Sequence, residues 1–510
     1  MSRFCLSPLF TDGAVLQRGK NIRVFGTGEN GVSLRVEICG ETAFCTVKDG
    51  KWTAVIPPLS PITSAVFAVS DTETGEEIRL ENVAVGEVWL AGGQSNMEFE
   101  LCNCKGGEGF LRNDETPNVR YYYFPKRTLL DDDHAEQVNN ARWTDFSDKE
   151  SARHWSAVAY FCAKEMSERL GVVVGIIGCN WGGTSASCWI DRKYVVGDAT
   201  VYFEEYDKFM SERTTEKAIA DYRDYQRYQA AWETRKNEYV KTHPTASETE
   251  IEAACGENRY PGPKAPCDPC SPGVLYNSMV KFVAPYTLGG VLWYQGETDE
   301  THPNAYYTLL TSLIRNWREL WHDDELPFVI GQLPMYAGGN PDGDEWSIIR
   351  DAQMRVFRTV KNTGIAVLAD CGERDNIHPV DKRNVGHRFA LQVINLIGGC
   401  EDAFAPTVSN VIWNESDVKL VVENTGDPLC CNGEPSGFEI CGYDGVYCPA
   451  KADIITDNGI TKIVVSSDKV KQPRGVRYLW KNYAEVNIFG ASGLPLVPFS
   501  YTVQSEGIII

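Results

Sequence analysis

The chain has 510 residues, of which 43% are hydrophobic, and its 70 acidic and 49 basic residues give a formal net charge of −21. This length exceeds one ordinary core, so two or three globular domains are expected, and the composition excludes a disordered chain. The acidic balance, without any local basic run, argues against nucleic acid or an anionic membrane surface as a partner. We therefore expect a neutral or small partner.

The start of the chain and its cysteines bear on its compartment. Residues 1–13 lack a basic leader followed by an apolar stretch of roughly 7 to 15 residues, and no apolar run approaches the roughly 18 residues that span a bilayer. We therefore expect a cytoplasmic protein. The 17 cysteines, an odd number at irregular spacings, are expected to be reduced. Cys267 and Cys270, with Cys255 upstream, lack a convincing fourth zinc ligand, so neither a metal nor a cofactor is predicted.

Two kinds of pattern follow one another along the chain. Residues 1–84 consist of short alternating or β-branched runs broken by Gly, Pro and Asp, which predict an N-terminal β-sandwich module. Residues 85–402 alternate apolar strands with amphipathic helices, which predicts an α/β catalytic domain with a doubly wound parallel sheet. The expected strands are 88–91, 172–178, 290–294, 328–332 and 365–369, and the expected helices are 154–170, 304–321, 346–360 and 380–397.

An insertion interrupts this domain over about residues 195–272. It begins as a charged, Tyr-rich segment, for which we expect a helical hairpin beside the catalytic domain, and it ends as a loop rich in Pro, Gly and Cys. Residues 403–510 return to alternating strands and turns. They predict a second, C-terminal all-β module.

Ser95 is the first candidate catalytic residue. It follows the apolar run 88–91 and two glycines, which allow a sharp turn, and it begins whatever helix comes next. The amino end of a helix offers N–H groups and a partial positive potential to a developing oxyanion. Taken alone, the same pattern fits a polar turn capped by serine equally well.

His378 is the candidate base for such a nucleophile. It lies in the loop after the strand 365–369, at the same sheet edge as Ser95 if the strands are parallel. Asp375, three residues earlier, could accept the Nδ1–H of the imidazole and leave Nε2 facing the serine. A solvated surface loop would show the same spacing.

Two further loops point toward this edge. Gly182 or Gly183 follows one expected strand and offers an unhindered N–H, and the amide of Gln295 follows another. With the N–H of Ser95 they could form an oxyanion hole of three donors. Each loop alone reads as a turn or a helix cap, but four such loops at one edge are hard to explain by chance.

These motifs together resemble the sialate O-acetylesterase-like family, within the wider SGNH (GDSL-type) hydrolases. The motifs are G-G-Q-S-N-M-E at 92–98, N-W-G-G-T at 180–184, V-L-W-Y-Q-G-E-T-D at 291–299 and I-H-P at 377–379. Further stretches, from 9–18 to 491–499, extend the resemblance over nearly the whole chain. The Gly-x-Ser-x-Gly elbow of α/β-hydrolases is absent, which argues against that fold.

The resemblance implies roles for these residues and an SGNH-type fold. Ser95 would be the nucleophile, His378 the base and Asp375 its acidic partner, with Asp370 as the alternative acid. Ser95, Gly183 and Gln295 would form the oxyanion hole. The remaining candidates, for contact with substrate, are Gln94, Trp181, Tyr294 and Glu297.

The expected function is therefore hydrolysis of sugar O-acetyl esters through an acyl-enzyme, with sialic acid as the first expected sugar. An esterase for acetylated xylo- or manno-oligosaccharides would need the same catalytic loops. From another class, a non-catalytic carbohydrate-binding protein is the alternative. The sequence predicts neither the acetylated hydroxyl nor the oligomeric state.

Overall fold

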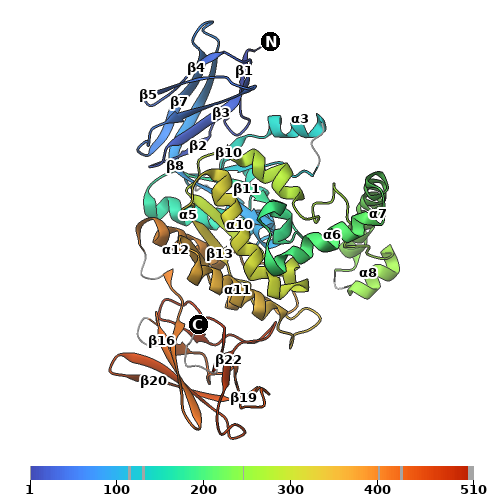
Figure 1. The fold of residues 1–510 in the computed structure, drawn as a ribbon, viewed down its shortest axis with the longest axis vertical. Helices are drawn as coiled ribbons and strands as arrows, with labels where there is room; N and C mark the ends of the chain where they lie inside the picture. Colours follow the sequence, from blue (N-terminus) through green and yellow to red (C-terminus); the bar gives the residue numbers. More distant parts are fainter. Residues whose placement is uncertain are drawn as a thin grey trace.

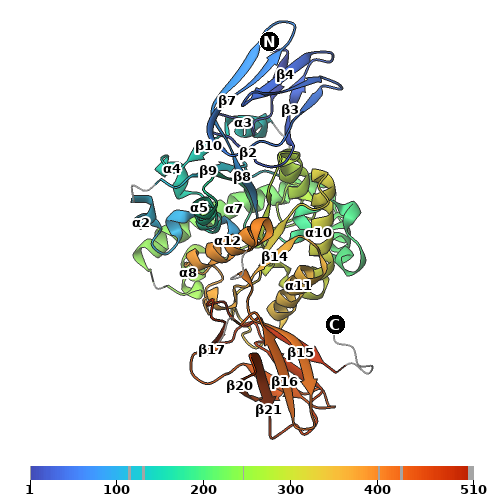
Figure 2. The same cartoon turned by 90° about the vertical axis from the view of Figure 1, so that its left-hand side faces the viewer.

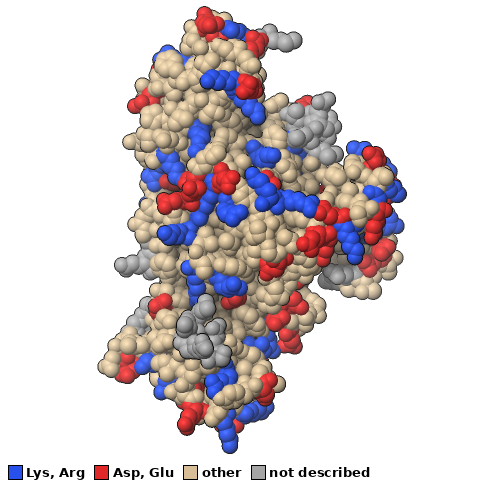
Figure 3. All heavy atoms as spheres, in the orientation of Figure 1, with Lys and Arg blue, Asp and Glu red and all other residues tan. Residues whose placement is uncertain are grey.

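The computed structural model describes residues 2–112, 116–128, 132–244, 246–399, 403–425 and 429–503. A central α/β part lies between an N-terminal and a C-terminal all-β part, which occupy opposite ends of the molecule (Figure 1). On the face shown in Figure 3, acidic and basic side chains are interspersed.

A parallel sheet forms the centre of the α/β part. Its strand order is β10, β9, β11, β8, β12, β13, β14, and all neighbours are parallel except the edge strand β10. The strands β11, β12, β13 and β14 are buried along their whole length, as expected for a sheet covered on both faces. Their bounds are β8 Glu77–Gly93, β9 Val119–Tyr123, β10 Trp143–Asp145, β11 Val174–Asn180, β12 Gly290–Tyr294, β13 Phe328–Gly331 and β14 Thr363–Ala366.

Two pairs of helices cover this sheet. α5 (Ala157–Leu170) packs against α12 (Arg383–Gly398), and α10 (Tyr306–Trp321) packs against α11 (Glu345–Thr359). In Figure 2, α12 lies on one side of β14, and α10 and α11 lie on the other. The helix expected from residue 154 begins at 157 because Ser156 caps it, its hydroxyl accepting the N–H of Ala159 at 3.1 Å. The predicted mixed α/β architecture is confirmed.

Shorter helices complete this part of the chain. They are α1 Ser95–Glu98, η1 Leu101–Asn103, α2 Gly107–Arg112, α3 Asp132–Asn140, α4 Lys149–Arg153, η2 Ala186–Trp189, η3 Arg192–Tyr194, η4 Gly197–Thr200, η5 Tyr276–Val280, α9 Lys281–Val283, η6 Glu297–Thr301, η7 Pro303–Ala305 and η8 Ala369–Cys371.

The N-terminal strands form two small sheets, and one of them continues into the central sheet. The first half of β8 pairs with β7 and β2, and its second half lies between β11 and β12. One strand therefore passes through the expected boundary at residue 84, and the division into three domains stays a prediction. The other strands are β1 Phe4–Leu6, β2 Val15–Gln17, β3 Ile22–Gly28, β4 Ser33–Ile38, β5 Glu41–Thr46, β6 Lys51–Ile56 and β7 Ile62–Asp71.

The C-terminal part is built from antiparallel strands with a core of its own. Its two larger sheets have the orders β15, β16, β21, β20 and β19, β18, β22, β24, and β17 pairs with β23. The bounds are β15 Thr407–Trp413, β16 Asp417–Glu423, β17 Cys430–Cys431, β18 Phe438–Cys441, β19 Cys448–Pro449, β20 Lys451–Asp457, β21 Ile460–Ser466, β22 Gly475–Tyr478, β23 Ile488–Phe489 and β24 Phe499–Thr502.

The expected insertion contains α6 (Val201–Ser211), the long α7 (Thr215–Thr242) and α8 (Glu248–Cys255), which packs against α7. Trp232 of α7 donates to the carbonyl of Gly256 at 2.6 Å, which ties the following loop to the helix. Cys255, Cys267 and Cys270 are free thiols. The cytoplasmic location stays a prediction.

No helix among the described residues is long and apolar enough to cross a membrane. No group of three or more His, Cys, Asp or Glu side chains in this part of the chain could hold a metal ion.

Gly93 fixes the turn at the end of β8, and its replacement gives a test of the fold. Its φ is +130°, and a Cβ at this position would lie 2.1 Å from the carbonyl oxygen of Tyr294. We expect Gly93→Ala to lower the free energy of unfolding by about 3 kcal/mol or more, because backbone atoms would have to move.

The control is Gly109→Ala in α2, where a Cβ would meet nothing within 4 Å. This change should leave the unfolding midpoint unchanged or slightly raised. Thermal and urea unfolding followed by circular dichroism measure both variants. Equal midpoints for Gly93→Ala and the parent protein would contradict the geometry of this turn.

Candidate active site

The strand β8 delivers Ser95 to the carboxyl edge of the central sheet. Gly92 packs against the ring of Trp293, and Gly93 passes close to the backbone of Tyr294, so only glycine leaves room for the chain to turn between β8 and α1. Ser95 is then the first residue of α1. The sequence prediction of a strand, a tight turn and a helix beginning at the serine is confirmed at these positions.

His378 lies beside Ser95, although 283 positions separate them. The imidazole Nε2 is 2.8 Å from the Ser95 Oγ, within hydrogen-bond distance. The loop that carries His378 is tightened by the side chain of Asn376, which accepts the His378 N–H at 3.0 Å. The structure therefore brings together the predicted nucleophile and the predicted base.

Burial lowers the pKa of His378, and the positive charge of Lys382 lowers it further, while the Glu98 carboxylate acts in the opposite direction. The net direction is downward from the ordinary histidine value of about 6.5. The imidazole is thus neutral near pH 7. A neutral imidazole can accept the proton of the serine hydroxyl.

Asn96 joins three segments behind this pair. Its side-chain N–H₂ donates to Glu297 Oε1 at 2.6 Å and to the carbonyl of Ile377 at 2.9 Å, and its oxygen accepts from Lys382 Nζ at 2.5 Å. Asn96, Glu297 and Lys382 are all buried. Asn96 and Lys382 were not among the predicted site residues; the only sequence signal was their place one residue after Ser95 and four after His378.

The buried charges of this network affect one another. Burial lowers the pKa of Lys382 to about 8, and the nearby Glu297 carboxylate opposes that shift. Burial raises the pKa of Glu297, and the hydrogen bond from Asn96 acts against this. Buried charges are tolerated when they are paired and hydrogen-bonded, so the network holds a cation close to the base.

The structure does not bring either candidate acid to His378. The Asp375 carboxylate pairs with Arg374 at 2.8 Å, and its side chain is 73% exposed. The Asp370 carboxylate makes a two-pronged ion pair with Arg388, one arm of which measures 2.7 Å. Among the described residues, neither carboxylate makes a hydrogen bond with the imidazole.

Gln295 is buried, and its amide points at acceptors of the protein itself. Its Nε2 lies 2.5 Å from Asp299 Oδ2, 3.1 Å from Gln94 Oε1 and 3.2 Å from the carbonyl of Thr184. Two N–H bonds thus face three acceptors. The structure places Gln295 as a support for the neighbouring loops and leaves it no free N–H for an oxyanion.

Two backbone donors remain beside Ser95. The N–H groups of Ser95 and Gly183 donate to no acceptor within the described residues. The N–H of Gly182 donates to Glu98 Oε2 at 2.6 Å. The carbonyl of Gly183 contacts the insertion, because Cys270 Sγ lies 3.3 Å and Tyr260 Oη 3.5 Å away.

The four candidate substrate contacts divide into two groups. Gln94, Tyr294 and Glu297 are 2%, 1% and 3% exposed, so they lie behind the site, where packing and internal hydrogen bonds occupy them. Trp181 is partly exposed, with Lys126 Nζ 5.5 Å from its ring centre. Trp181 alone of the four stands where a substrate could touch it.

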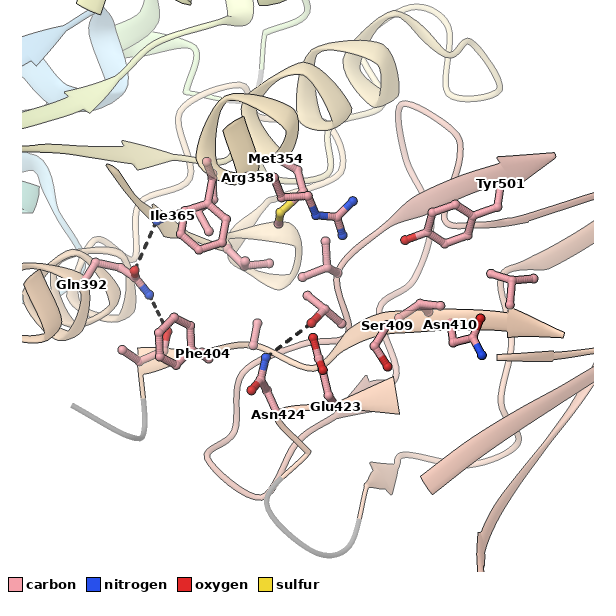
Figure 4. A pocket seen from close by; sticks show the side chains of 18 residues that line it. Met354, Arg358, Ile365, Gln392, Phe404, Ser409, Asn410, Glu423, Asn424 and Tyr501 are labelled. Atoms are coloured by element: carbon pink, nitrogen blue, oxygen red, sulfur yellow. Dashed lines mark hydrogen bonds between the residues drawn. The ribbon is translucent and has the colours of Figure 1, made fainter. Parts of the chain in front are cut away.

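A cavity of about 410 Å³ lies elsewhere, between the α/β part and the C-terminal β part. Figure 4 shows side chains from both parts around it, with Met354 and Ile365 on one side and Tyr501 on the other. None of the candidate catalytic residues lines it. The cavity is therefore separate from the Ser95–His378 pair.

Comparisons with known proteins find similarity to carbohydrate esterases. Residues 268–395 match a family described as carbohydrate esterase, sialic acid-specific acetylesterase, and this range contains His378 but not Ser95. The chain is 26% and 27% identical to the sialate O-acetylesterases of Rattus norvegicus and Mus musculus, over 95% of this chain and 92% of each relative. A crystal structure of a carbohydrate acetylesterase from Xanthomonas citri is similar with a TM-score of 0.76 and 27% identity, covering 98% of this chain and 100% of that one.

The charge of Lys382 gives a prediction for the pH dependence of the reaction. A base must be neutral to act, so activity falls as the pH drops through its pKa. Because Lys382 lowers the pKa of His378, we expect Lys382→Met to move the acidic limb of kcat/KM to higher pH.

Lys382→Arg keeps the positive charge and should move this limb less. Rates on p-nitrophenyl acetate between pH 4 and 9 measure the effect, and circular dichroism checks that each variant is folded. An acidic limb that stays in place in Lys382→Met, or that moves to lower pH, would contradict the influence of Lys382 on His378.

Proposed function

Since the chain belongs to the sialate O-acetylesterase-like family of carbohydrate esterases, we propose that it hydrolyses O-acetyl esters of sugars with Ser95 as nucleophile and His378 as general base. The observation that carries the proposal is the 2.8 Å separation of Ser95 Oγ and His378 Nε2 at the carboxyl edge of a parallel sheet. In such sheets, ligands bind in the crevice outside the carboxyl ends of the strands.

The reaction proceeds in two halves. Ser95 Oγ attacks the acetyl carbonyl carbon while His378 Nε2 takes the hydroxyl proton, and the tetrahedral intermediate collapses as the imidazolium gives that proton to the leaving sugar oxygen. A water molecule then attacks the acetyl-enzyme, with His378 again accepting and returning a proton. Acetate leaves and Ser95 is restored.

Two backbone N–H groups would stabilise the negative charge on the carbonyl oxygen. Those of Ser95 and Gly183 are unoccupied among the described residues and flank the nucleophile. These two N–H groups take the place of the Gln295 side-chain amide as the proposed oxyanion donors. The Gln295 amide instead supports the neighbouring loops. An SGNH-type arrangement, in which separate loops supply nucleophile, donors and base, is part of the proposal.

The predicted triad acid, Asp375, has no catalytic role in this proposal. Asp375 is exposed and paired with Arg374, so we propose that the Ser95–His378 pair acts without a carboxylate bound to Nδ1. The charge of Glu98, three residues after Ser95, favours the imidazolium that forms during attack. Glu98 would thereby supply part of what an aspartate supplies in a triad.

The names of the curated relatives support O-acetylated sialic acid as the first substrate of this proposal. Acetylated xylo- or manno-oligosaccharides are the second candidate, since the formal charge of −21 favours uncharged substrates. A role as a non-catalytic binding protein is disfavoured, because such a protein has no need of a serine hydroxyl within hydrogen-bond distance of a partly buried imidazole.

Substitution of the pair tests the mechanism. We expect Ser95→Ala and His378→Ala each to lower kcat by about 10³-fold or more. The kcat of the double variant should be no lower than that of the slower single variant, because the two groups act as a unit. Hydrolysis of p-nitrophenyl acetate and of acetylated sugars measures this. The matched control is His387→Ala, whose imidazole pairs with Glu165 on the neighbouring helix and should change kcat by less than about twofold. A Ser95→Ala enzyme with nearly normal turnover would refute the proposal.

A second prediction concerns the acid. Asp375→Asn should keep kcat within about fivefold of the parent, because its carboxylate does not orient the imidazole. Asp370→Asn should lower the melting temperature instead, since the buried Arg388 guanidinium would lose its ion-pair partner. A loss of about 10³-fold or more in kcat for Asp375→Asn alone would restore the triad expected from the sequence.

A further inference from the structure

A surface cleft of about 500 Å³ lies beside the nucleophile. Trp155 and Tyr121 contribute to its lining but are only 2% and 1% exposed, and their rings stack with centres 5.3 Å apart. Tyr123, which is partly exposed, stacks on Tyr121 at 6.0 Å. Glu98, Lys126, Arg142 and His154 stand among the polar side chains around it. Of the residues that line the cleft, Glu98 alone takes part in the proposed mechanism.

Glu98 connects the cleft to the catalytic pair. A Cβ on Gly182 would lie 3.2 Å from Ser95 Cβ and 3.3 Å from Glu98 Oε2, so the nucleophile and this carboxylate flank the same glycine. Glu98 also pairs with Lys126, which lies over the ring of the partly exposed Trp181. One wall of the cleft is therefore the helix turn that carries Ser95.

The sheet topology places the cleft along the same edge as the reaction centre. Ser95 follows β8, Gly182 follows β11 and Lys126 follows β9, three adjacent parallel strands. Arg142 precedes the antiparallel edge strand β10, so it also lies at this edge. The cleft thus continues the crevice at the carboxyl ends of the strands, outward from Ser95 to the rim of the sheet.

The charges around the cleft are already balanced by the protein. Lys126 pairs with Glu98, His154 Nδ1 lies 2.8 Å from Glu100 Oε1, and Arg142 lies 3.9 Å from Asp148. An anionic ligand would have to displace a carboxylate from Lys126 or Arg142. Hydroxyl groups can share such pairs as donors and acceptors, and the partly exposed ring of Tyr123 offers an aromatic surface on which a sugar ring can pack.

We propose that this cleft binds the uncharged sugar residues that flank the acetylated sugar, so that the enzyme prefers acetylated oligosaccharides to acetylated monosaccharides. The inference rests on the proposed function for the chemistry at Ser95. It adds where the remaining sugar residues of the substrate bind and that these residues are uncharged. The acetyl group would lie at Ser95, and the sugar chain would extend past Glu98 and Lys126 toward Arg142 and His154.

The test uses two side chains of the cleft that take no part in the proposed mechanism. Arg142→Ala and His154→Ala should each raise KM for acetylated tetrasaccharides of the xylo-, manno- or sialyl-type by about tenfold, the loss expected for one hydrogen bond to substrate, with kcat unchanged. KM for the matching acetylated monosaccharide and for p-nitrophenyl acetate should stay within about twofold. Arg227→Ala is the matched control, because this arginine is exposed on α7 and does not line the cleft.

Calorimetry with the Ser95→Ala protein gives a readout that needs no turnover. This protein should bind an acetylated tetrasaccharide, and the added Arg142→Ala change should weaken the binding about tenfold. The enzyme could hydrolyse sugar acetates with the same KM for mono- and tetrasaccharides and with no effect of either variant. That result would refute the binding role of the cleft and leave the proposed function intact. A parent enzyme that cleaves no sugar acetate and a Ser95→Ala protein that binds no oligosaccharide would overturn both proposals.

Discussion

The catalytic geometry depends on the hydrogen bonds of the Asn96 side chain. This side chain is fully buried and spans the helix turn of Ser95, the loop of Glu297 and the loop of His378, through the carbonyl of Ile377. A buried amide is costly unless its donors and acceptor are satisfied, and all of them are satisfied in the observed arrangement of these loops. That arrangement fixes the backbone next to both Ser95 and His378. The 2.8 Å contact of the catalytic pair is thus supported from behind as well as formed by the pair itself.

The sequence predicted the framework of the site because simple rules govern it. Apolar runs with short polar loops predict parallel strands, and the loops after those strands meet at one edge. This reasoning makes Ser95 and His378 candidates for the same sheet edge, the resemblance to the sialate O-acetylesterase-like family assigns their roles, and the structure brings the two side chains together. The predicted strand over 290–294 agrees at both ends with β12, because a run buried on both faces has little freedom in its bounds.

The directions of the side chains in the loops could not be predicted in the same way. Asp375 has the spacing of a triad acid, but its neighbour Arg374 supplies a closer charge, and the carboxylate lies in solvent. Gln295 has the position of an oxyanion donor, but buried acceptors from three segments compete for its amide. Such competition depends on residues far apart in the chain. The roles of Lys382 and Asn96 could not be predicted for the same reason, because they depend on a hydrogen bond between residues 286 positions apart.

The charge of Glu98, in the same helix turn as Ser95, acts on the catalytic pair and also on the neighbouring cleft. Burial and Lys382 keep His378 neutral in the resting enzyme, which suits a proton acceptor but disfavours the imidazolium that must follow. Glu98 opposes both effects, and its own charge is shared with Lys126 and the N–H of Gly182. A carboxylate free of such partners beside the oxyanion donors would repel the charge that develops on the carbonyl oxygen. The pairing of Glu98 with Lys126 therefore lets a negative group lie next to the nucleophile, and the same pair forms the wall of the neighbouring cleft.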